Sequence, residues 1–222
     1  MLKIIAHRGA SYFEPENTLK AYKRAIEMGA DFVELDVRMS KDNELIIMHD
    51  PDISRTTNGK GLVNDFTLDE LKEFDAGKGE RIPTLKGVID FVKNKVGLVI
   101  EIKEPGTEKA ILEKIEENDI ENIILTSFFH KSIKNVFKPN LKTNLGIIFT
   151  CEPVNVHKLA ADANASVIFP SYRYITKDLV KKAKNHGLNI YPWAIDDEEI
   201  FKKFASMGVD GVVTNKLIKK IS

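Results

Sequence analysis

The sequence is short of several features that would place it in other classes of protein. Only one of its 222 residues, Cys151, is a cysteine, which excludes an intrachain disulfide and fits a reducing compartment. No apolar run approaches about 18 residues, so we predict no membrane insertion. The apolar stretch at the N-terminus is too short and too charged for a signal peptide. These absences together predict a cytoplasmic protein.

An excess of charge of either sign is also missing. The 33 lysines and arginines are balanced by 33 aspartates and glutamates, for a formal net charge of +0. A broad electrostatic attraction to nucleic acid is therefore not expected, and we predict no nucleic-acid partner. Neither GxGxxG nor a P-loop occurs, so a nucleotide-binding fold would lack its usual motif. The 43% of hydrophobic residues suffices for a core and argues against disorder.

Short apolar runs alternate with amphipathic runs along the chain. The expected strands are 2–6, 31–38, 97–103, 122–127, 143–149, 166–169, 188–195 and 211–214. The expected helices are 18–28, 84–95, 108–118, 130–137, 154–163, 176–186, 197–207 and 216–221. Strict alternation predicts a parallel sheet with helices outside it, and about eight units predict a single-domain (β/α)8 TIM barrel. An open doubly wound sheet is the structural alternative.

One stretch, 51–83, interrupts this alternation. It is too long for a bare connection between a strand and a helix, so we interpret it as an insertion after the second barrel strand. A short helix is expected over 67–74, where Thr67 and Glu70 form a capping box. Residues 44–48 are expected to extend the second strand or to pair with it.

Carboxylates lie inside two of the apolar strands. Glu34 and Asp36 are two residues apart, as are Glu101 and Lys103, so each pair shares one face of its strand. An isolated pair of this kind often neutralises nearby cations. In a barrel, however, the apolar neighbours would pack outward on the helices and the acids would face the interior. Three carboxylates without a thiolate favour Mg²⁺, Ca²⁺ or Mn²⁺ over zinc.

Two histidines stand directly after apolar runs. His7 and His49 each have a charged neighbour, Arg8 or Asp50, and fall at the carboxyl ends of strands, where barrel enzymes place their active sites. Histidine exchanges protons near neutral pH, so the two are candidates for acid–base chemistry. The other histidines are interpreted as structural or surface residues.

Two cations and one aromatic residue complete the candidate site. Arg8 offers a planar fork for phosphate oxygens, and Lys103 offers a compact charge, although both could simply neutralise the acids. Trp193, late in its strand, could stack on a substrate or fill the barrel end. With a divalent metal the charges sum to about +1, which suits an anion such as a phosphodiester.

The motifs occur in an order that resembles the glycerophosphodiester phosphodiesterase family over essentially the whole chain. The segments that carry the resemblance are Ala6-His-Arg-Gly9, Pro15-Glu-Asn-Thr18, Gly29-Ala-Asp31, Glu34-Leu-Asp36, Lys41-Asp42, His49-Asp50, Ile82-Pro-Thr-Leu85, Glu101-Ile-Lys103, Ser127-Phe128, Trp193 and Gly208-Val-Asp-Gly-Val-Val-Thr214. Any one of them is a weak signal, whereas the ordered set is specific.

The resemblance implies a barrel with an insertion after its second strand and a divalent metal on Glu34, Asp36 and Glu101. It implies that His7 and His49 form the general acid–base pair. The substrate would be a glycerophosphodiester such as glycerophosphocholine or glycerophosphoethanolamine, and the products glycerol 3-phosphate and an alcohol. Which histidine is the base, the head-group preference and the oligomeric state stay open.

Arg8 and Lys103 would contact the phosphate, and Glu16 and Asn17 would orient the site. The chain departs from the family pattern at Asn215, where many members have aspartate, and at Ala194-Ile-Asp196, where Thr-Val-Asn is more usual. Neither departure is expected to touch the metal or the histidines.

Three alternative functions of such a barrel remain open. A barrel phospholipase of the C or D type would act on an intact lipid and should carry an apolar lip, which the polar segment 51–83 does not show. A non-catalytic barrel that binds phosphate ligands should have lost an acid or a histidine. A sugar-phosphate isomerase barrel would lack this order of motifs.

Overall fold

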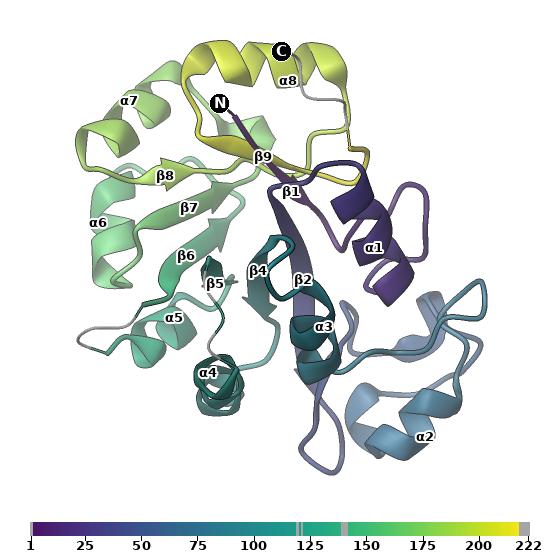
Figure 1. The fold of residues 1–222 in the computed structure, drawn as a ribbon. Helices are drawn as coiled ribbons and strands as arrows, with labels where there is room; N and C mark the ends of the chain where they lie inside the picture. Colours follow the sequence, from purple (N-terminus) through teal and green to yellow (C-terminus); the bar gives the residue numbers. More distant parts are fainter. Residues whose placement is uncertain (1, 119, 121, 139–141, 218–222) are drawn as a thin grey trace.

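The computed structural model describes residues 2–118, 120, 122–138 and 142–217, and within these ranges it forms a nearly closed parallel barrel surrounded by helices (Figure 1). The barrel strands are β1 (Lys3–Ala6), β2 (Phe32–Met39), β4 (Gly97–Ile102), β5 (Ile123–Ser127), β6 (Asn144–Phe149), β7 (Val167–Pro170), β8 (Asn189–Ile190) and β9 (Gly211–Thr214). The helices are α1 (Leu19–Glu27), α2 (Leu68–Glu73), α3 (Leu85–Val92), α4 (Glu108–Glu117), α5 (His130–Val136), α6 (Val156–Asp162), α7 (Lys177–Asn185) and α8 (Glu198–Met207). The predicted fold class is confirmed. The expected helix 216–221 lies mostly outside the described residues.

The barrel closes between its first and last strands. The hydrogen-bonded order is β8-β7-β6-β5-β4-β2-β1-β9. Irregular backbone after β8 completes the ring against β9, where Ile195 N–H donates to the Val213 carbonyl at 2.9 Å. The strand expected over 188–195 is regular only over Asn189–Ile190. Pro192 explains the difference, because it has no N–H to donate to a ladder.

Two apolar layers lie on the two sides of the barrel wall. Val33, Leu35 and Val37 belong to the outer layer, between the strands and the helices. A smaller inner layer fills the barrel and consists of Ile5, Val99, Ile124, Ile148, Val167, Phe169, Tyr191 and Val213. The alternate residues of β2 therefore face the interior, as the period of two predicted.

The insertion after β2 forms a separate lobe at the lower right of Figure 1. It begins after β3 (Leu45–Ile47), which pairs antiparallel with β2, and contains the 3₁₀ turns η1 (Ile53–Arg55) and η2 (Val63–Asp65) and the helix α2. Its core is shared with β3 and consists of Ile46 from that strand together with Met48, Ile53, Val63, Leu71, Ala76 and Ile82. The predicted capping box is present, since Thr67 accepts from Glu70 N–H and Glu70 accepts from Thr67 N–H.

A further 3₁₀ turn, η3 (Tyr172–Tyr174), follows β7. No helix in the described part of the chain is both long enough and apolar enough to cross a membrane.

The loop from β1 to α1 runs against the helix that it precedes. Thr18 caps α1 by accepting from Ala21 N–H. Gly9 has a positive φ of 79°, and a Cβ added there would lie 2.7 Å from both the backbone carbon and the Cβ of Ala21. The loop therefore needs a residue that tolerates the left-handed region and has no side chain.

We expect Gly9→Ala to lower the free energy of unfolding by about 2–5 kcal/mol, because left-handed strain adds to overpacking. Gly29→Ala is the matched control. Gly29 has a φ of 80° but open space around its Cβ position, so it should lose only about 1–2 kcal/mol. Urea unfolding measures both, and equal losses would show that the contact with Ala21 does not matter.

Candidate active site

A pocket lies at the carboxyl ends of the barrel strands and brings the predicted site residues together. Its lining includes seven of the eight, namely His7, Arg8, Glu34, His49, Glu101, Lys103 and Trp193. Asp36, the eighth, has no exposed surface and joins the same cluster through its carboxylate. Five strands, β1, β2, β3, β4 and β8, and the loops after them thus contribute to one site.

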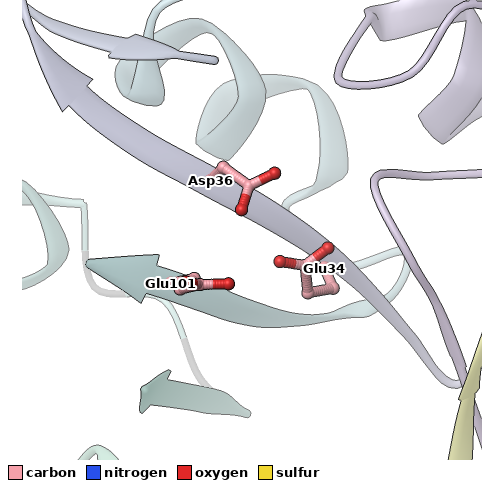
Figure 2. Close-up of side chains that lie close together, drawn as sticks. All are labelled: Glu34, Asp36 and Glu101. Atoms are coloured by element: carbon pink, nitrogen blue, oxygen red, sulfur yellow. The ribbon is translucent and has the colours of Figure 1, made fainter. Parts of the chain in front are cut away.

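The three acids converge inside the barrel. Glu34 and Asp36 project from β2 and Glu101 from the adjacent β4, and their carboxylates turn toward a common space (Figure 2). The pairing of β2 with β4 sets Asp36 directly opposite Glu101. One oxygen from each side chain lies within 4.8 Å of the others.

The electrostatics of this cluster indicate a missing positive charge. Burial, together with repulsion from Asp36, raises the pKa of Glu101 to about 7. Burial and both neighbouring carboxylates raise the pKa of Glu34 well above its ordinary value. Asp36 Oδ1 is buried and has no hydrogen-bond donor among the described residues. An all-oxygen set of buried carboxylates with an unmatched acceptor fits a hard divalent cation.

Two cations already lie against the acids. Lys103 Nζ is 2.8 Å from Glu101 Oε1 and 3.5 Å from Asp36 Oδ1. Arg8 Nε is 3.2 Å from Asp36 Oδ2, and the Arg8 backbone N–H donates to Glu34 Oε2 at 2.8 Å. Burial opposes the ionisation of Asp36, but Lys103 and Arg8 outweigh it and lower the pKa of Asp36.

Asn17 supports the same carboxylate from the β1–α1 loop. Its Nδ2 donates to Asp36 Oδ2 at 2.8 Å, while its Oδ1 accepts from the Tyr22 hydroxyl at 3.0 Å. The buried tyrosine on α1 thereby sets the direction of the amide. Asn17 thus orients a carboxylate of the cluster, as the resemblance implied.

The two histidines have different partners. His7 Nδ1 is 2.7 Å from Asn215 Oδ1, and His49 Nδ1 is 2.5 Å from Asp50 Oδ1. Burial and the adjacent Arg8 lower the pKa of His7 to about 4. Burial also lowers the pKa of His49. One histidine is thus held by a neutral carboxamide and the other by a carboxylate.

The contact between Asn215 and His7 corrects one expectation. The departure from the family pattern at Asn215 was expected to leave the histidines untouched, and that expectation is wrong. The cause is barrel closure: β9 pairs with β1, so the residue after β9 lies beside the residue after β1. His7 N–H donates to the Thr214 carbonyl at 2.9 Å, which sets this proximity.

Arg55 of the insertion is a residue that sequence reasoning missed. Its two terminal nitrogens donate to Glu16 at 2.9 and 2.7 Å, and its Nε donates to Asp50. Glu16 in turn accepts from Arg8 at 2.9 Å. Arg55 therefore connects Asp50, the partner of His49, with Glu16, the partner of Arg8. No sequence pattern links it to Glu16, which lies 39 residues away.

Aromatic residues form one wall of the pocket. Phe128, which follows β5, meets Trp193 edge to face with ring centroids 5.6 Å apart. Trp193 Nε1 donates to the Phe169 carbonyl at 2.9 Å, so its polar atom is satisfied within the barrel. The surface that these rings offer to a ligand is apolar.

Comparisons with known proteins agree with this geometry. The sequence model of the glycerophosphoryl diester phosphodiesterase family matches residues 7–219. A glycerophosphodiester phosphodiesterase of Caldanaerobacter subterraneus subsp. tengcongensis is 42% identical over 96% of this chain and 93% of its own length.

Solved structures resemble the barrel over nearly its full length. A phosphodiesterase of Oleispira antarctica, in complex with the product sn-glycerol-3-phosphate, superposes with a TM-score of 0.89 at 29% identity, over 96% of this chain and 92% of that one. A glycerophosphodiester phosphodiesterase of Thermotoga maritima gives 0.84 at 30% identity, over 97% and 95%. The fold and the pocket thus define a barrel hydrolase of phosphoric diesters. The chain belongs to the glycerophosphoryl diester phosphodiesterase family.

We expect Arg55→Gln to slow phosphodiester hydrolysis by about 10- to 100-fold, because His49 and Arg8 lose a shared brace and small misplacements at a site are costly. Arg81→Gln is the matched control: it is an exposed arginine of the same insertion whose hydrogen bond is to the Glu73 carbonyl. Steady-state kinetics measures both. A rate for Arg55→Gln within twofold of the control would refute the bracing role.

Proposed function

We propose that this protein hydrolyses glycerophosphodiesters, such as glycerophosphocholine or glycerophosphoethanolamine, to glycerol 3-phosphate and an alcohol. The proposal includes dependence on a divalent cation, Mg²⁺ or Ca²⁺ with Mn²⁺ as a further candidate, and a general acid–base role for His7 and His49. The observation that carries it is the convergence of two carboxylates, two cations and two histidines on one pocket, with the buried carboxylate of Asp36 beside them.

The charge of the pocket supports a phosphodiester as substrate. Arg8 and Lys103 face the cavity beside the carboxylate cluster, and both can donate to non-bridging phosphoryl oxygens. The family relationship and the product complex of the Oleispira antarctica phosphodiesterase point to the same class of ligand. Trp193 and Phe128 would line the path of the non-phosphate parts of the substrate.

Glu34, Asp36 and Glu101 would hold the cation. A divalent cation bound there supplies positive charge beside a phosphoryl oxygen and lowers the pKa of a hydroxyl bound to it. Arg8 and Asn17 orient the carboxylates, and Lys103 stays available to the phosphate. A bound cation would offset the repulsion between the acids that, together with burial, raises the pKa of both glutamates.

The two histidines would divide the proton transfers. One takes a proton from the attacking hydroxyl, and the other gives a proton to the leaving alcohol, which is a poor leaving group as an alkoxide. Both line the pocket, and both have Nδ1 occupied by a protein partner, which directs each reactive Nε2 to the ligand.

We expect exhaustive chelation to abolish the conversion of glycerophosphocholine to glycerol 3-phosphate, followed by phosphorus NMR, and Mg²⁺ or Ca²⁺ to restore it. Glu34→Ala should lose bound metal, measured by elemental analysis, together with activity. Glu116→Ala, an exposed acid on α4, is the control and should retain both. Full activity after chelation would remove the cation from the proposal.

We expect His7→Ala and His49→Ala each to lower the turnover rate at least ~100-fold, the scale of general acid–base catalysis. His186→Ala serves as the control, because His186 is exposed at the end of α7, where its Nδ1 bonds to the Lys182 carbonyl and its ring stacks on His157, and neither of these two histidines lines the pocket. A near-normal rate for either pocket variant would contradict its assignment.

A further inference from the structure

The side chain of Asn215 lies between the ring of His7 and the carboxylate of Asp196. Asn215 Oδ1 is 2.7 Å from His7 Nδ1, and Asn215 Nδ2 donates to Asp196 Oδ2 at 2.6 Å. Asp196 and Asn215 lie 19 residues apart in the chain and are direct partners, with the acid and the amide in contact.

Asp196 is held as an acceptor. Its Oδ1 accepts from the Thr214 hydroxyl at 2.9 Å and from the backbone N–H groups of Asn215 and Lys216 at 2.7 and 3.1 Å. Burial opposes its ionisation, but these hydrogen bonds and the one from Asn215 Nδ2 lower the pKa of Asp196. At neutral pH the group is a carboxylate, which has no proton to donate.

This carboxylate determines which way the amide points. If the amide were reversed, its oxygen would meet an acceptor oxygen at hydrogen-bond distance, with no hydrogen between them. Asn215 Oδ1 must therefore face His7. An amide oxygen only accepts, so the Nδ1 of a neutral His7 must carry the proton, and Nε2 keeps its lone pair.

We propose that Asp196 and Asn215 are positioning residues that lock His7 in the Nδ1–H tautomer and so present Nε2 to the pocket as a proton acceptor. The catalytic consequence rests on the proposed function, whereas the tautomer does not. His7 then matches the requirement for the group that takes a proton from the attacking hydroxyl. His49 differs, since its Nδ1 faces the carboxylate of Asp50, which stabilises a protonated ring.

The neutral amide of Asn215 also affects the pH at which His7 takes up a proton. The charged side chains that act most strongly on His7 are Arg8, Asp36 and Glu16. Glu34, His49, Glu101 and Lys103 line the same pocket, and Asp196 lies behind Asn215. Burial and Arg8 lower the pKa of His7 to about 4, and an amide beside Nδ1 opposes this less than a carboxylate would. Neutral His7 is thereby maintained at and below neutral pH.

The tautomer is tested without any substrate by long-range ¹H–¹⁵N NMR of protein labelled at histidine nitrogen, with His7 assigned from the spectrum of His7→Gln. We expect the Nδ1–H form of His7 in the unaltered protein. Asn215→Leu, which keeps the shape but removes the amide, should give a mixture of tautomers. A dominant Nε2–H form in the unaltered protein, or an unchanged spectrum in Asn215→Leu, would overturn the lock.

The exchanged pair, Asp196→Asn with Asn215→Asp, keeps an acceptor at Nδ1 and adds a charge to it. We expect the Nδ1–H tautomer to persist and the acidic limb of the pH–rate profile to move to higher pH by about one to three pH units, because the carboxylate stabilises protonated His7. If Asn215→Leu does not fold, the tautomer and the acidic limb of this exchanged variant test the positioning role in its place. An acidic limb that stays in place would contradict the assignment of His7 as the proton acceptor.

Turnover separates the two proposals. Asn215→Leu should lower kcat by about 10- to 100-fold with a smaller change in KM, since orientation of the base and not binding is lost. A wild-type kcat in Asn215→Leu would overturn the positioning role. An unaltered protein that shows the Nδ1–H tautomer but hydrolyses no glycerophosphodiester would refute the proposed function and leave the lock intact.

Discussion

Three carboxylates in the apolar interior of a barrel are the constraint on which the rest of this structure depends. Glu34, Asp36 and Glu101 stand above an inner layer of aliphatic and aromatic side chains, where ionised groups are poorly solvated. Their mutual repulsion adds to the cost of burial. The arrangement is stable as an ionised cluster only with compensating positive charge, and the surrounding loops are organised to provide it.

The β1–α1 loop contributes two of the side chains that contact the acids, Arg8 and Asn17. It bends back at Gly9, which has a positive φ, and returns as α1, so that Arg8 and Asn17 both reach β2. Arg8 itself has a φ of 57°, a conformation that directs its backbone N–H to Glu34. Lys103, directly after β4, completes the set. The same loop therefore contains positive-φ residues, Arg8 and Gly9 among them, together with the partly buried cation of Arg8.

The insertion after β2 has a role in this arrangement although it lies outside the barrel. Its small core holds η1 against the rim, and Arg55 from η1 joins Glu16 and Asp50. Glu16 holds Arg8, and Asp50 holds His49. The lobe therefore braces Arg8 and His49 together through Arg55.

The sequence predicted the barrel and most of the site because both depend on local patterns. Alternation of apolar and amphipathic runs reports which faces are buried, and the period of two in β2 correctly placed Glu34 and Asp36 inside. The strand expected over 188–195 was mostly irregular, because closure beside Pro192 depends on contacts with β9. Arg55 and Asn215 were not predicted as site residues. Their partners are distant in the chain: Arg55 lies 39 residues from Glu16, and Asn215, although noted as a departure from the family pattern, lies 208 residues from His7.

By itself, then, the sequence determined the fold class and supplied the acids, cations and histidines of the candidate site, because side-chain chemistry and strand periodicity can be read from short stretches of chain. The tertiary structure alone decided which groups meet. It set Asp36 opposite Glu101 through the register of β2 and β4, and it brought Asn215 to His7 through the pairing of β9 with β1. The state of a titratable group depends on such neighbours, so the difference between His7 beside an amide and His49 beside a carboxylate exists only in the folded barrel.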